Sequence, residues 1–233
     1  MSKFLGEIEK SSSMSLKVVE KFREALKEGQ LKVGDKLPPE RALAAQLGIS
    51  RAPLREGLGI LSAYGILETK PGEGTFVTDK FAENVFDFLG ISDISNKENF
   101  MNLLQFRIIL EVGSVDMAIK NIDSEEYKKM EFVINKLQKE TDKDKIVLID
   151  AEFHEMMIRL TKNQILIETY KMISKLLIKL FSKLMGQGDV RTDIINAHRE
   201  ILNYLKDGEV EKCKNSLRKH IYNNRELIDK YSD

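Results

Sequence analysis

Four side chains in the second half of the chain have the types and the spacing to hold a metal ion. The chain has three histidines, His154, His198 and His220, and Asp150 precedes the first of them by four residues. Because residues four apart share one face of a helix, Asp150 and His154 can point the same way. Three imidazoles and one carboxylate from three helices can converge on one divalent cation inside a helical bundle. From spacing alone, four solvent-exposed helix positions are the simpler interpretation.

A single arginine in a strongly apolar stretch is the next candidate. Arg107 is surrounded in sequence by leucine, isoleucine and phenylalanine. It must therefore be paired or reach a cavity, because a buried unpaired charge is costly. One interpretation is an ion pair with Glu111, four residues later. The other is a contact with the carboxylate of a bound small molecule, which matches the planar guanidinium. The two interpretations are compatible.

A second group of arginines lies near the N-terminus, at Arg41, Arg51 and Arg55. Arg51 and Arg55 are four apart at the start of one predicted helix, and Arg41 lies in the first turn of the helix before it. Guanidinium groups placed there can contact guanine edges and phosphates of DNA. The alternatives are exposed arginines without a partner and, for Arg41, an ion pair with Glu40 or Glu56.

The segment that carries these arginines predicts a winged helix-turn-helix. A helix is expected to begin near Pro39 and to end at Gly48, and Ser50 can cap the next helix. Leucines at i, i+4 and i+7 predict the buried face of that next helix, at Leu54, Leu58 and Leu61. Two short β-prone runs, 66–70 and 75–78, flank a Pro-Gly-Glu-Gly turn, which predicts a hairpin wing.

The rest of the chain is predicted to be helical, so the expected fold class is mainly α. A first helix over 16–28, capped by Ser15 or a neighbour, completes a winged helix-turn-helix domain at 1–78. A linker at 79–97 contains a short apolar-faced helix. An all-α bundle at 98–233 follows. Its six helices are predicted at 98–121, 124–139, 144–161, 164–185, 191–206 and 209–230.

Composition limits the class of protein. The 37 basic residues balance the 37 acidic residues, and residues 1–80 hold 13 basic and 11 acidic side chains. Any positive surface for DNA must therefore be local. The single cysteine, Cys213, excludes an intrachain disulfide and fits a reducing compartment. No apolar run is long enough to span a bilayer, and no signal-peptide core is present, so we expect a cytoplasmic protein without a membrane partner.

The stretch LKVGDKLPPERALAAQLGISRAPLREGL, followed by GIL and GTFV, resembles the winged-helix domain of GntR-family bacterial transcription regulators. The resemblance implies a homodimer on a palindromic DNA operator. The predicted DNA contacts are the three arginines, the residues on either side of Arg51, and a glycine of the wing. They are Arg41, Ser50, Arg51, Ala52, Arg55 and Gly72. Glu73 at the wing tip and Gly59 in the second helix depart from the family, where both positions are often more basic. Phosphate attraction should therefore depend heavily on the arginines.

Two further stretches, LIDAEFHEMMIRLTKN and AHREILNYLKDGEVEKCKNSLRKHI, resemble the FCD ligand-binding domain of the FadR-type branch. The resemblance implies a divalent ion, first zinc, with nickel and manganese as alternatives, held by Asp150, His154, His198 and His220. It also implies that Arg107 binds the carboxylate of an effector. Asn163 matches a family asparagine near the effector pocket; the alternative, which we favour, is a helix cap.

These features together predict a transcription regulator and not an enzyme. A small organic acid bound at the metal site would control operator binding, with effector-induced release of a repressor as the first hypothesis and activation as its alternative. One rival is a regulator for which the cation itself is the signal, and another is a purely structural metal. A metal-dependent hydrolase is the third, but the cluster has no evident extra general base.

Overall fold

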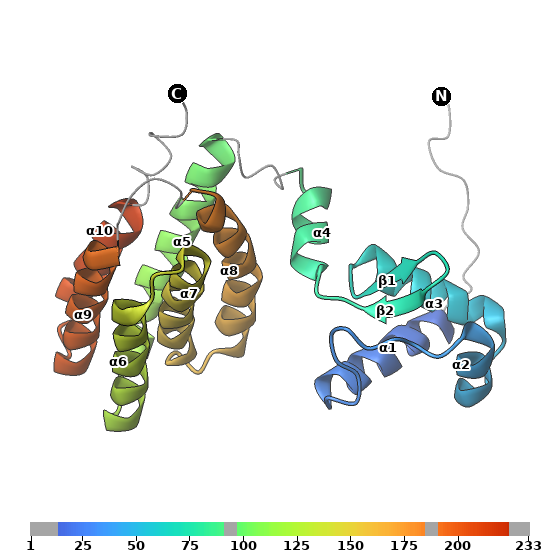
Figure 1. Ribbon diagram of the computed structural model, residues 1–233. Helices are drawn as coiled ribbons and strands as arrows, with labels where there is room; N and C mark the ends of the chain where they lie inside the picture. The colour runs from blue at the N-terminus through green and yellow to red at the C-terminus, as the bar shows by residue number, and fades with distance from the viewer. Residues whose placement is uncertain (1–13, 91–96, 185–190, 224–233) are drawn as a thin grey trace, which may run out of the picture. The chain divides into compact units, whose positions relative to one another are not determined.

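The computed structural model describes residues 14–90, 97–184 and 191–223. Contacts divide the chain into two compact units, Met1–Leu89 and Gly90–Asp233 (Figure 1). The boundary between the units falls within the segment predicted as a linker. Among the described residues, no helix is both long enough and apolar enough to cross a membrane.

The first unit is a helix-turn-helix followed by a hairpin and one more helix. Its elements are α1 (Met14–Lys27), α2 (Glu40–Leu47), α3 (Arg51–Ala63), β1 (Leu67–Lys70), β2 (Gly74–Val77) and α4 (Phe81–Phe88). Helix α1 packs along α3. A Cβ at Gly57 of α3 would lie 2.8 Å from the Val18 side chain and 2.9 Å from the Ser15 carbonyl oxygen. Ser15 is buried inside α1 at this contact, so Ser15 is not the N-cap, and the neighbours before Met14 that the prediction also allowed lie outside the described residues.

The turn between α2 and α3 forms as the sequence predicts. Gly48 ends α2 with a φ of 66°, and its N–H reaches the carbonyl oxygens of the preceding turn. Ser50 occupies the N-cap position of α3, but its side chain makes no capping hydrogen bond. Leu54 and Leu61 are buried and Leu58 is half-buried, so the predicted apolar face of α3 is the one that packs.

The wing is an antiparallel pair in which Leu67 lies opposite Val77 and Lys70 opposite Gly74. Its tip is a tight turn closed by a 3.0 Å hydrogen bond from the Glu73 N–H to the Lys70 carbonyl oxygen. Gly72 occupies the turn with a φ of 77°, which glycine adopts at no steric cost.

The short helix predicted within the linker is α4. It belongs to the first unit and packs against the other elements of that unit. The Asn84 side chain donates a 3.1 Å hydrogen bond to the Ala63 carbonyl oxygen, and the Lys80 ammonium lies 2.7 Å from the Glu68 carboxylate. Polar contacts at its start thus fix α4 beside the end of α3 and the beginning of the wing.

The second unit is a bundle of six helices in its described part. They are α5 (Lys97–Ala118), α6 (Ser124–Lys139), α7 (Lys143–Arg159), α8 (Gln164–Leu184), α9 (Arg191–Asp207) and α10 (Val210–Asn223). The predicted bounds of α6 are correct. Asp123 fixes its first residue by accepting hydrogen bonds from two N–H groups of the first turn. Asp142 caps α7 in the same way. The predicted end of the last helix lies outside the described residues.

Helices α5, α7, α6, α9 and α10 contact one another in that order, and α10 returns to α5, which closes a ring (Figure 1). Helix α8 covers the outer side of α7. Large apolar side chains fill the bundle, and each contributes about 1.5–3 kcal/mol when fully buried. Those with almost no exposure include Phe100, Met130, Leu137, Phe153, Met157 and Ile201. This tightly packed interior holds the candidate site.

Candidate metal centre and nucleic-acid interface

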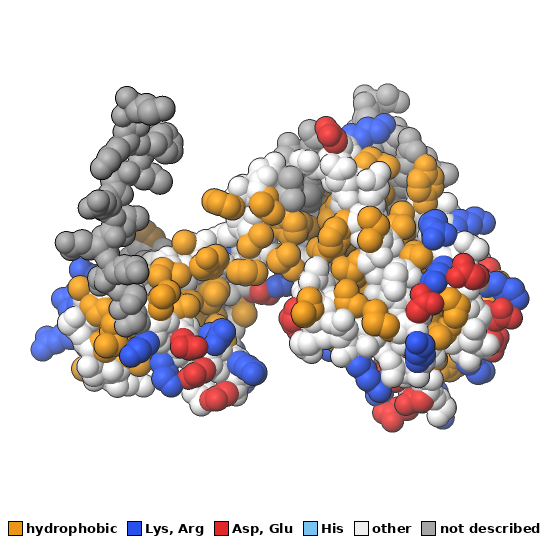
Figure 2. Space-filling view, turned by 180° about the vertical axis from the view of Figure 1, so that it is seen from behind, with side chains coloured by type: hydrophobic (Ala, Val, Ile, Leu, Met, Phe, Trp, Pro, Cys, Tyr) orange, Lys and Arg blue, Asp and Glu red, His pale blue; other side chains and the backbone are white. Residues whose placement is uncertain are grey.

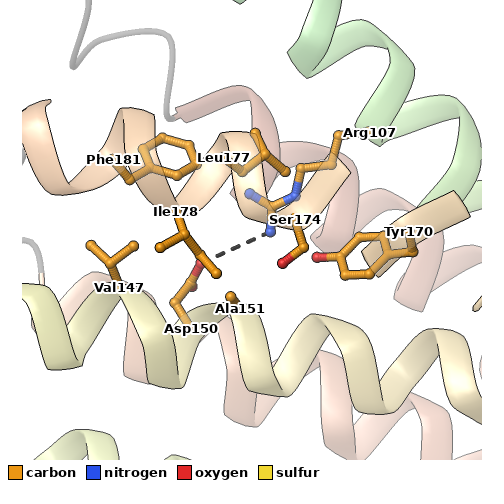
Figure 3. Close-up of a pocket in the computed structure, with 9 residues that line it drawn as sticks. All are labelled: Arg107, Val147, Asp150, Ala151, Tyr170, Ser174, Leu177, Ile178 and Phe181. Carbon is orange, nitrogen blue, oxygen red and sulfur yellow. Dashed lines mark ion pairs between the residues drawn. The ribbon is translucent and has the colours of Figure 1, made fainter. Parts of the chain in front are cut away.

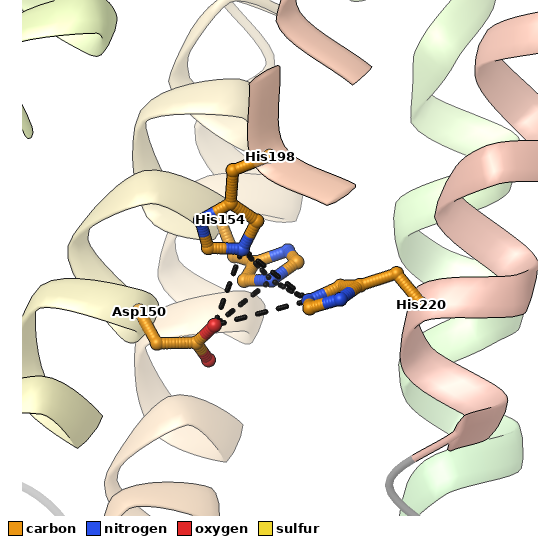
Figure 4. Close-up of side chains that lie close together, drawn as sticks. All are labelled: Asp150, His154, His198 and His220. Atoms are coloured by element: carbon orange, nitrogen blue, oxygen red, sulfur yellow. Dashed lines mark hydrogen bonds and ion pairs between the residues drawn. The ribbon is translucent and has the colours of Figure 1, made fainter. Parts of the chain in front are cut away.

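The four predicted ligand residues meet at one point inside the bundle (Figure 4). Asp150 and His154 come from α7, His198 from α9 and His220 from α10. The Nε2 atoms of the three imidazoles are 3.1, 3.2 and 3.3 Å apart. Oδ1 of Asp150 lies 3.2 Å from Nε2 of His198, 3.7 Å from that of His154 and 3.8 Å from that of His220. Spacing alone had favoured exposed positions; all three histidines are buried.

The spacing of these nitrogen atoms fits a first-row divalent ion. Zinc lies about 2.0–2.1 Å from histidine nitrogens, so tetrahedral ligands would be about 3.4 Å apart and right-angled octahedral ligands about 3.0 Å apart. The three observed nitrogen separations fall between these limits. Three imidazoles and one carboxylate are also a donor set that zinc, nickel and manganese accept. The residues present therefore fit such an ion.

A buried carboxylate fixes the orientation of one imidazole. Oε2 of Glu111, on α5, lies 2.7 Å from Nδ1 of His154. Burial works to raise the pKa of Glu111, but Arg107 and His154 hold it below its ordinary value, so the carboxylate accepts and Nδ1 donates. Nε2 of His154 then carries its lone pair toward the centre of the cluster. Such a carboxylate–histidine contact is usual behind a metal ligand.

Burial keeps the other two imidazoles neutral at neutral pH. It lowers the pKa of His198 to about 4, and with the neighbouring imidazoles it holds the pKa of His220 well below its ordinary value. The His198 ring also stacks on Phe153, with ring centres 4.0 Å apart and 12° between the planes. Burial would lower the pKa of His154 too, but the charges of Glu111 and Asp150 outweigh it and raise that pKa. Neutral imidazole is the form that binds metals.

Arg107 is paired, as one interpretation of the sequence expected. Its guanidinium Nε donates to Oε1 of Glu111, so one carboxylate joins Arg107 to His154. A terminal nitrogen of Arg107 lies 3.9 Å from Oδ2 of Asp150. Asp150 thus turns one oxygen toward the histidines and the other toward Arg107. Burial tends to raise the pKa of Asp150, but His154 and His198 hold it well below its ordinary value, so the group is a carboxylate.

A small cavity adjoins the cluster on the side of Asp150 and Arg107 (Figure 3). Its volume is about 10 Å³, which is room for about one water molecule. The lining residues come from α5, α7 and α8 and are Arg107, Val147, Asp150, Ala151, Tyr170, Ser174, Leu177, Ile178 and Phe181. Arg107 therefore reaches a cavity as well as a carboxylate partner.

Asn163 has a local role in the structure. Its side-chain oxygen accepts hydrogen bonds from the backbone N–H groups of Ile165, at 3.0 Å, and Leu166, at 3.3 Å. It is the N-cap of α8, which is the alternative that the sequence favoured, and it is absent from the described lining of the cavity. A contact between Asn163 and an effector remains a prediction.

The arginines of the first unit share one acidic partner. Oε2 of Glu40, at the start of α2, lies 2.7 Å from Nε of Arg55 and 3.4 Å from a terminal nitrogen of Arg51. The sequence had considered Arg51 and Arg55 without a partner and Glu40 as a partner for Arg41. Arg41 is exposed and makes no ion pair with any residue that the structure describes.

The predicted DNA-contacting residues all lie on exposed parts of the first unit or at its turns. Ala52 and the two arginines of α3 are exposed in the first turns of that helix, Ser50 precedes it, and Gly72 is at the wing tip. Figure 2 shows that much of the visible face is hydrophobic and that basic and acidic side chains are intermixed where charges occur, in keeping with the zero net charge. Positive potential at this interface is therefore local.

Comparison with known proteins decides the family. The family model described as "Bacterial regulatory proteins, gntR family" matches residues 14–77, and the model of the FCD domain matches residues 102–223. The uncharacterized HTH-type transcriptional regulator YcbG of Bacillus subtilis (strain 168) is 30% identical over 224 residues, which cover 95% of this chain and 92% of the relative. The chain belongs to the GntR family of bacterial transcription regulators and carries an FCD domain.

Other bacterial regulators align over similar lengths. The HTH-type transcriptional regulator LutR of the same organism is 25% identical over 212 residues, covering 88% of this chain and 97% of LutR. The structure of Streptococcus agalactiae GntR superposes with a TM-score of 0.61 at 21% identity, covering 91% of this chain and 99% of that one, which shows a shared fold. The gntR-family match and the named relatives, which are transcriptional regulators and not enzymes, show that this GntR regulator is a DNA-binding protein.

Sequence reasoning missed three features of the site in this GntR regulator. The pairing of Glu40 with α3 spans 11 and 15 residues across a turn, which no helical period reveals. The contact of Glu111 with His154 spans 43 residues. Tyr170 and Ser174 could have been found, because they are polar residues four apart on the otherwise apolar buried face of α8.

Proposed function

We propose that this GntR regulator is a repressor whose grip on operator DNA is released by a small organic acid bound beside a metal ion in the FCD domain. The observation that carries the proposal is the convergence of three buried Nε2 atoms and one carboxylate oxygen around a single point. Such convergence costs free energy without a cation, because lone pairs and negative charge face one another away from water. The cluster is therefore best explained as a metal centre.

The metal would be held by Asp150, His154, His198 and His220. Zinc is the first expectation, and nickel or manganese are the alternatives. Nickel or manganese would accept an oxygen atom of a bound acid beside the four protein ligands, and zinc would do so by expanding beyond four ligands. Glu111 keeps the His154 lone pair aimed at the centre.

The effector would bind in the small cavity, next to Asp150 and within reach of Arg107. Four polar side chains line this cavity and support the assignment. They are the carboxylate of Asp150, the guanidinium of Arg107 and the hydroxyl groups of Tyr170 and Ser174. A volume of about 10 Å³ is too small for an organic acid. Effector binding must therefore displace side chains of α8, which forms one wall.

The winged helix-turn-helix would act as one half of a homodimer on a palindromic operator. We assign base and phosphate contacts to α3, to the helix before it and to the wing, at Arg41, Ser50, Arg51, Ala52, Arg55 and Gly72. Exposed guanidinium groups at the start of α3 suit guanine edges and phosphates. Release would follow because the ligands come from α7, α9 and α10, so that occupancy changes how these helices pack. That change would bias the spacing of the two winged domains against half-sites about 34 Å apart.

The test is operator affinity of the full-length chain with and without metal. A palindromic duplex is selected from a random pool, and its Kd is measured by fluorescence anisotropy. Short organic acids (butyrate, succinate, 2-hydroxybutyrate and malate) are then added to zinc-loaded and metal-stripped protein. The proposal expects at least one acid to weaken DNA binding tenfold or more, and only in the zinc-loaded protein.

The same experiment separates the rivals. Release by zinc alone would identify a metal sensor, and release by an acid without metal would leave the ion a structural role. If no acid changes DNA binding in either state, the proposed effector control is wrong. A His154→Ala variant provides the matched control, because it removes a ligand while leaving the DNA-binding unit unchanged.

A further inference from the structure

The cavity beside the metal centre has a polar end and an apolar end. In Figure 3, the hydroxyl groups of Ser174 and Tyr170 lie near the Arg107 guanidinium, while Val147, Ile178 and Phe181 lie away from them. Asp150 belongs to both the cluster and the cavity wall, since one of its oxygens faces the histidines and the other faces Arg107. A ligand that enters must place its polar group at one end and present a carbon skeleton to the other.

Only a few charged side chains lie at or next to the cavity in the described part of the chain. Among the described residues, Arg107 and Glu111 are the only buried members of the Lys, Arg, Asp and Glu types. Asp150, with a side chain that is 15% exposed, is the other charged residue in the lining. One guanidinium and two carboxylates leave a single negative charge when the histidines are neutral. A divalent cation at the cluster changes this to a single positive charge.

One negative charge on a ligand would therefore neutralise the loaded site, and a second would not be matched. The Arg107 guanidinium is already paired with Glu111 and lies near Asp150, so once it has met one carboxylate of a ligand it has no capacity left for a second. The far end of the cavity is lined by aliphatic and aromatic side chains and offers no cation among the described residues. A buried carboxylate without a partner is strongly unfavourable.

We propose that the effector of this regulator is a monocarboxylate whose carbon skeleton is apolar beyond the end that meets the metal and Arg107, and that dicarboxylates are rejected by charge. This inference rests on the proposed function, since it requires an acid to bind at the metal site. It adds the chemical class of the acid. The apolar end contacts the skeleton, and the loaded centre neutralises the one carboxylate.

Isothermal titration calorimetry on the zinc-loaded full-length chain tests the inference with two pairs of four-carbon acids. Butyrate is compared with succinate, and 2-hydroxybutyrate with malate, so that each pair differs by a methyl group in place of a second carboxylate. We expect the monocarboxylate to bind at least tenfold more tightly in each pair that binds. A dicarboxylate that binds equally or better overturns the inference and leaves the proposed function intact. If none of the four acids binds, both fail.

A charge added at the apolar end should reverse the preference. Ile178 is half-buried in the cavity wall, so a lysine there can place its ammonium group at the far end. Ile178→Lys should improve succinate and malate relative to their partners by at least tenfold. Ile178→Gln is the matched variant of similar length without charge. A loss of affinity that both variants share reflects altered packing. A difference in affinity between the two variants reflects the added charge.

Zinc content and a thermal melt show that each variant is folded. If Ile178→Lys does not fold, the comparison of acids on the unmodified chain decides the question. A folded Ile178→Lys variant with the same ligand ratios as Ile178→Gln would contradict the role assigned to charge.

Discussion

Each unit of this regulator contains an arginine held by a glutamate, but the two pairs lie in opposite environments. In the FCD domain, the side chains of Arg107 and Glu111 are 1% and 0% exposed. In the winged domain, the side chains of Arg55 and Glu40 are 60% and 38% exposed, and their contact is 2.7 Å. Both pairs join a guanidinium to a carboxylate, and they differ in their exposure to solvent. The buried pair is a fixed part of the metal centre, whereas the exposed pair can exchange its partner.

Solvent explains why the two pairs suit different tasks. Breaking a buried pair leaves a charge without compensation and costs several kcal/mol. An exposed pair contributes about 0–1 kcal/mol, and salt screens it. A phosphate can therefore replace Glu40 as the partner of Arg55 at little cost. Glu111 cannot be replaced in this way, because it serves Arg107 and His154 together.

The largest effect should come from Glu111→Gln. Zinc affinity is expected to fall about 10- to 100-fold, because the partner that orients His154 is weakened. The free energy of unfolding should fall by about 3 kcal/mol, the lower end for a broken buried pair, because Asp150 lies 3.9 Å from Arg107 and compensates part of its charge. Competition with a chromophoric chelator and urea unfolding measure the two quantities.

The matched control for Glu111→Gln is Glu155→Gln, which removes a carboxylate from another i,i+4 pair. Glu155 contacts Arg159 at 2.6 Å near the surface of α7. Its loss should change stability by no more than about 1 kcal/mol and leave zinc affinity unchanged. Equal losses from the two variants would remove the distinction between buried and exposed pairs.

Arg51→Ala should act on DNA and not on the fold. Because Arg51 is exposed and contacts Glu40 at only 3.4 Å, its loss should leave the melting temperature within about 1 °C. Operator affinity should fall by at least about 1–3 kcal/mol if the guanidinium reads a base. Anisotropy with a selected palindrome at moderate salt is the measurement. Affinity like that of the unmodified chain would contradict the assignment.

The smallest effect is expected from Glu40→Gln. Removing a negative charge from the DNA-binding surface should raise affinity for random DNA a few-fold at low salt. Stability should change by less than about 1 kcal/mol. The ratio of operator to random-DNA affinity should fall, because Glu40 no longer holds Arg51 and Arg55 in place. An unchanged ratio would show that Glu40 does not position them.

The sequence predicted local structure better than it predicted the environment of the site. Caps such as Asp123 and the αL glycine Gly48 act within a few residues, so the bounds of α6 and the turn after α2 followed directly. Burial of the histidines did not follow, since spacing alone favoured solvent for them and only the family resemblance brought them together. Contacts across helices, such as Glu111 with His154, depend on packing that no local pattern records.

Native mass spectrometry of the gently purified chain can show whether the buried acid–histidine cluster holds a divalent ion. We expect close to one divalent ion per chain, its loss in a His154→Ala, His220→Ala double variant, and its retention in Arg51→Ala. A chain without a bound ion after incubation with zinc, nickel and manganese, or a double variant that still holds one, would show that these four residues do not form a metal centre.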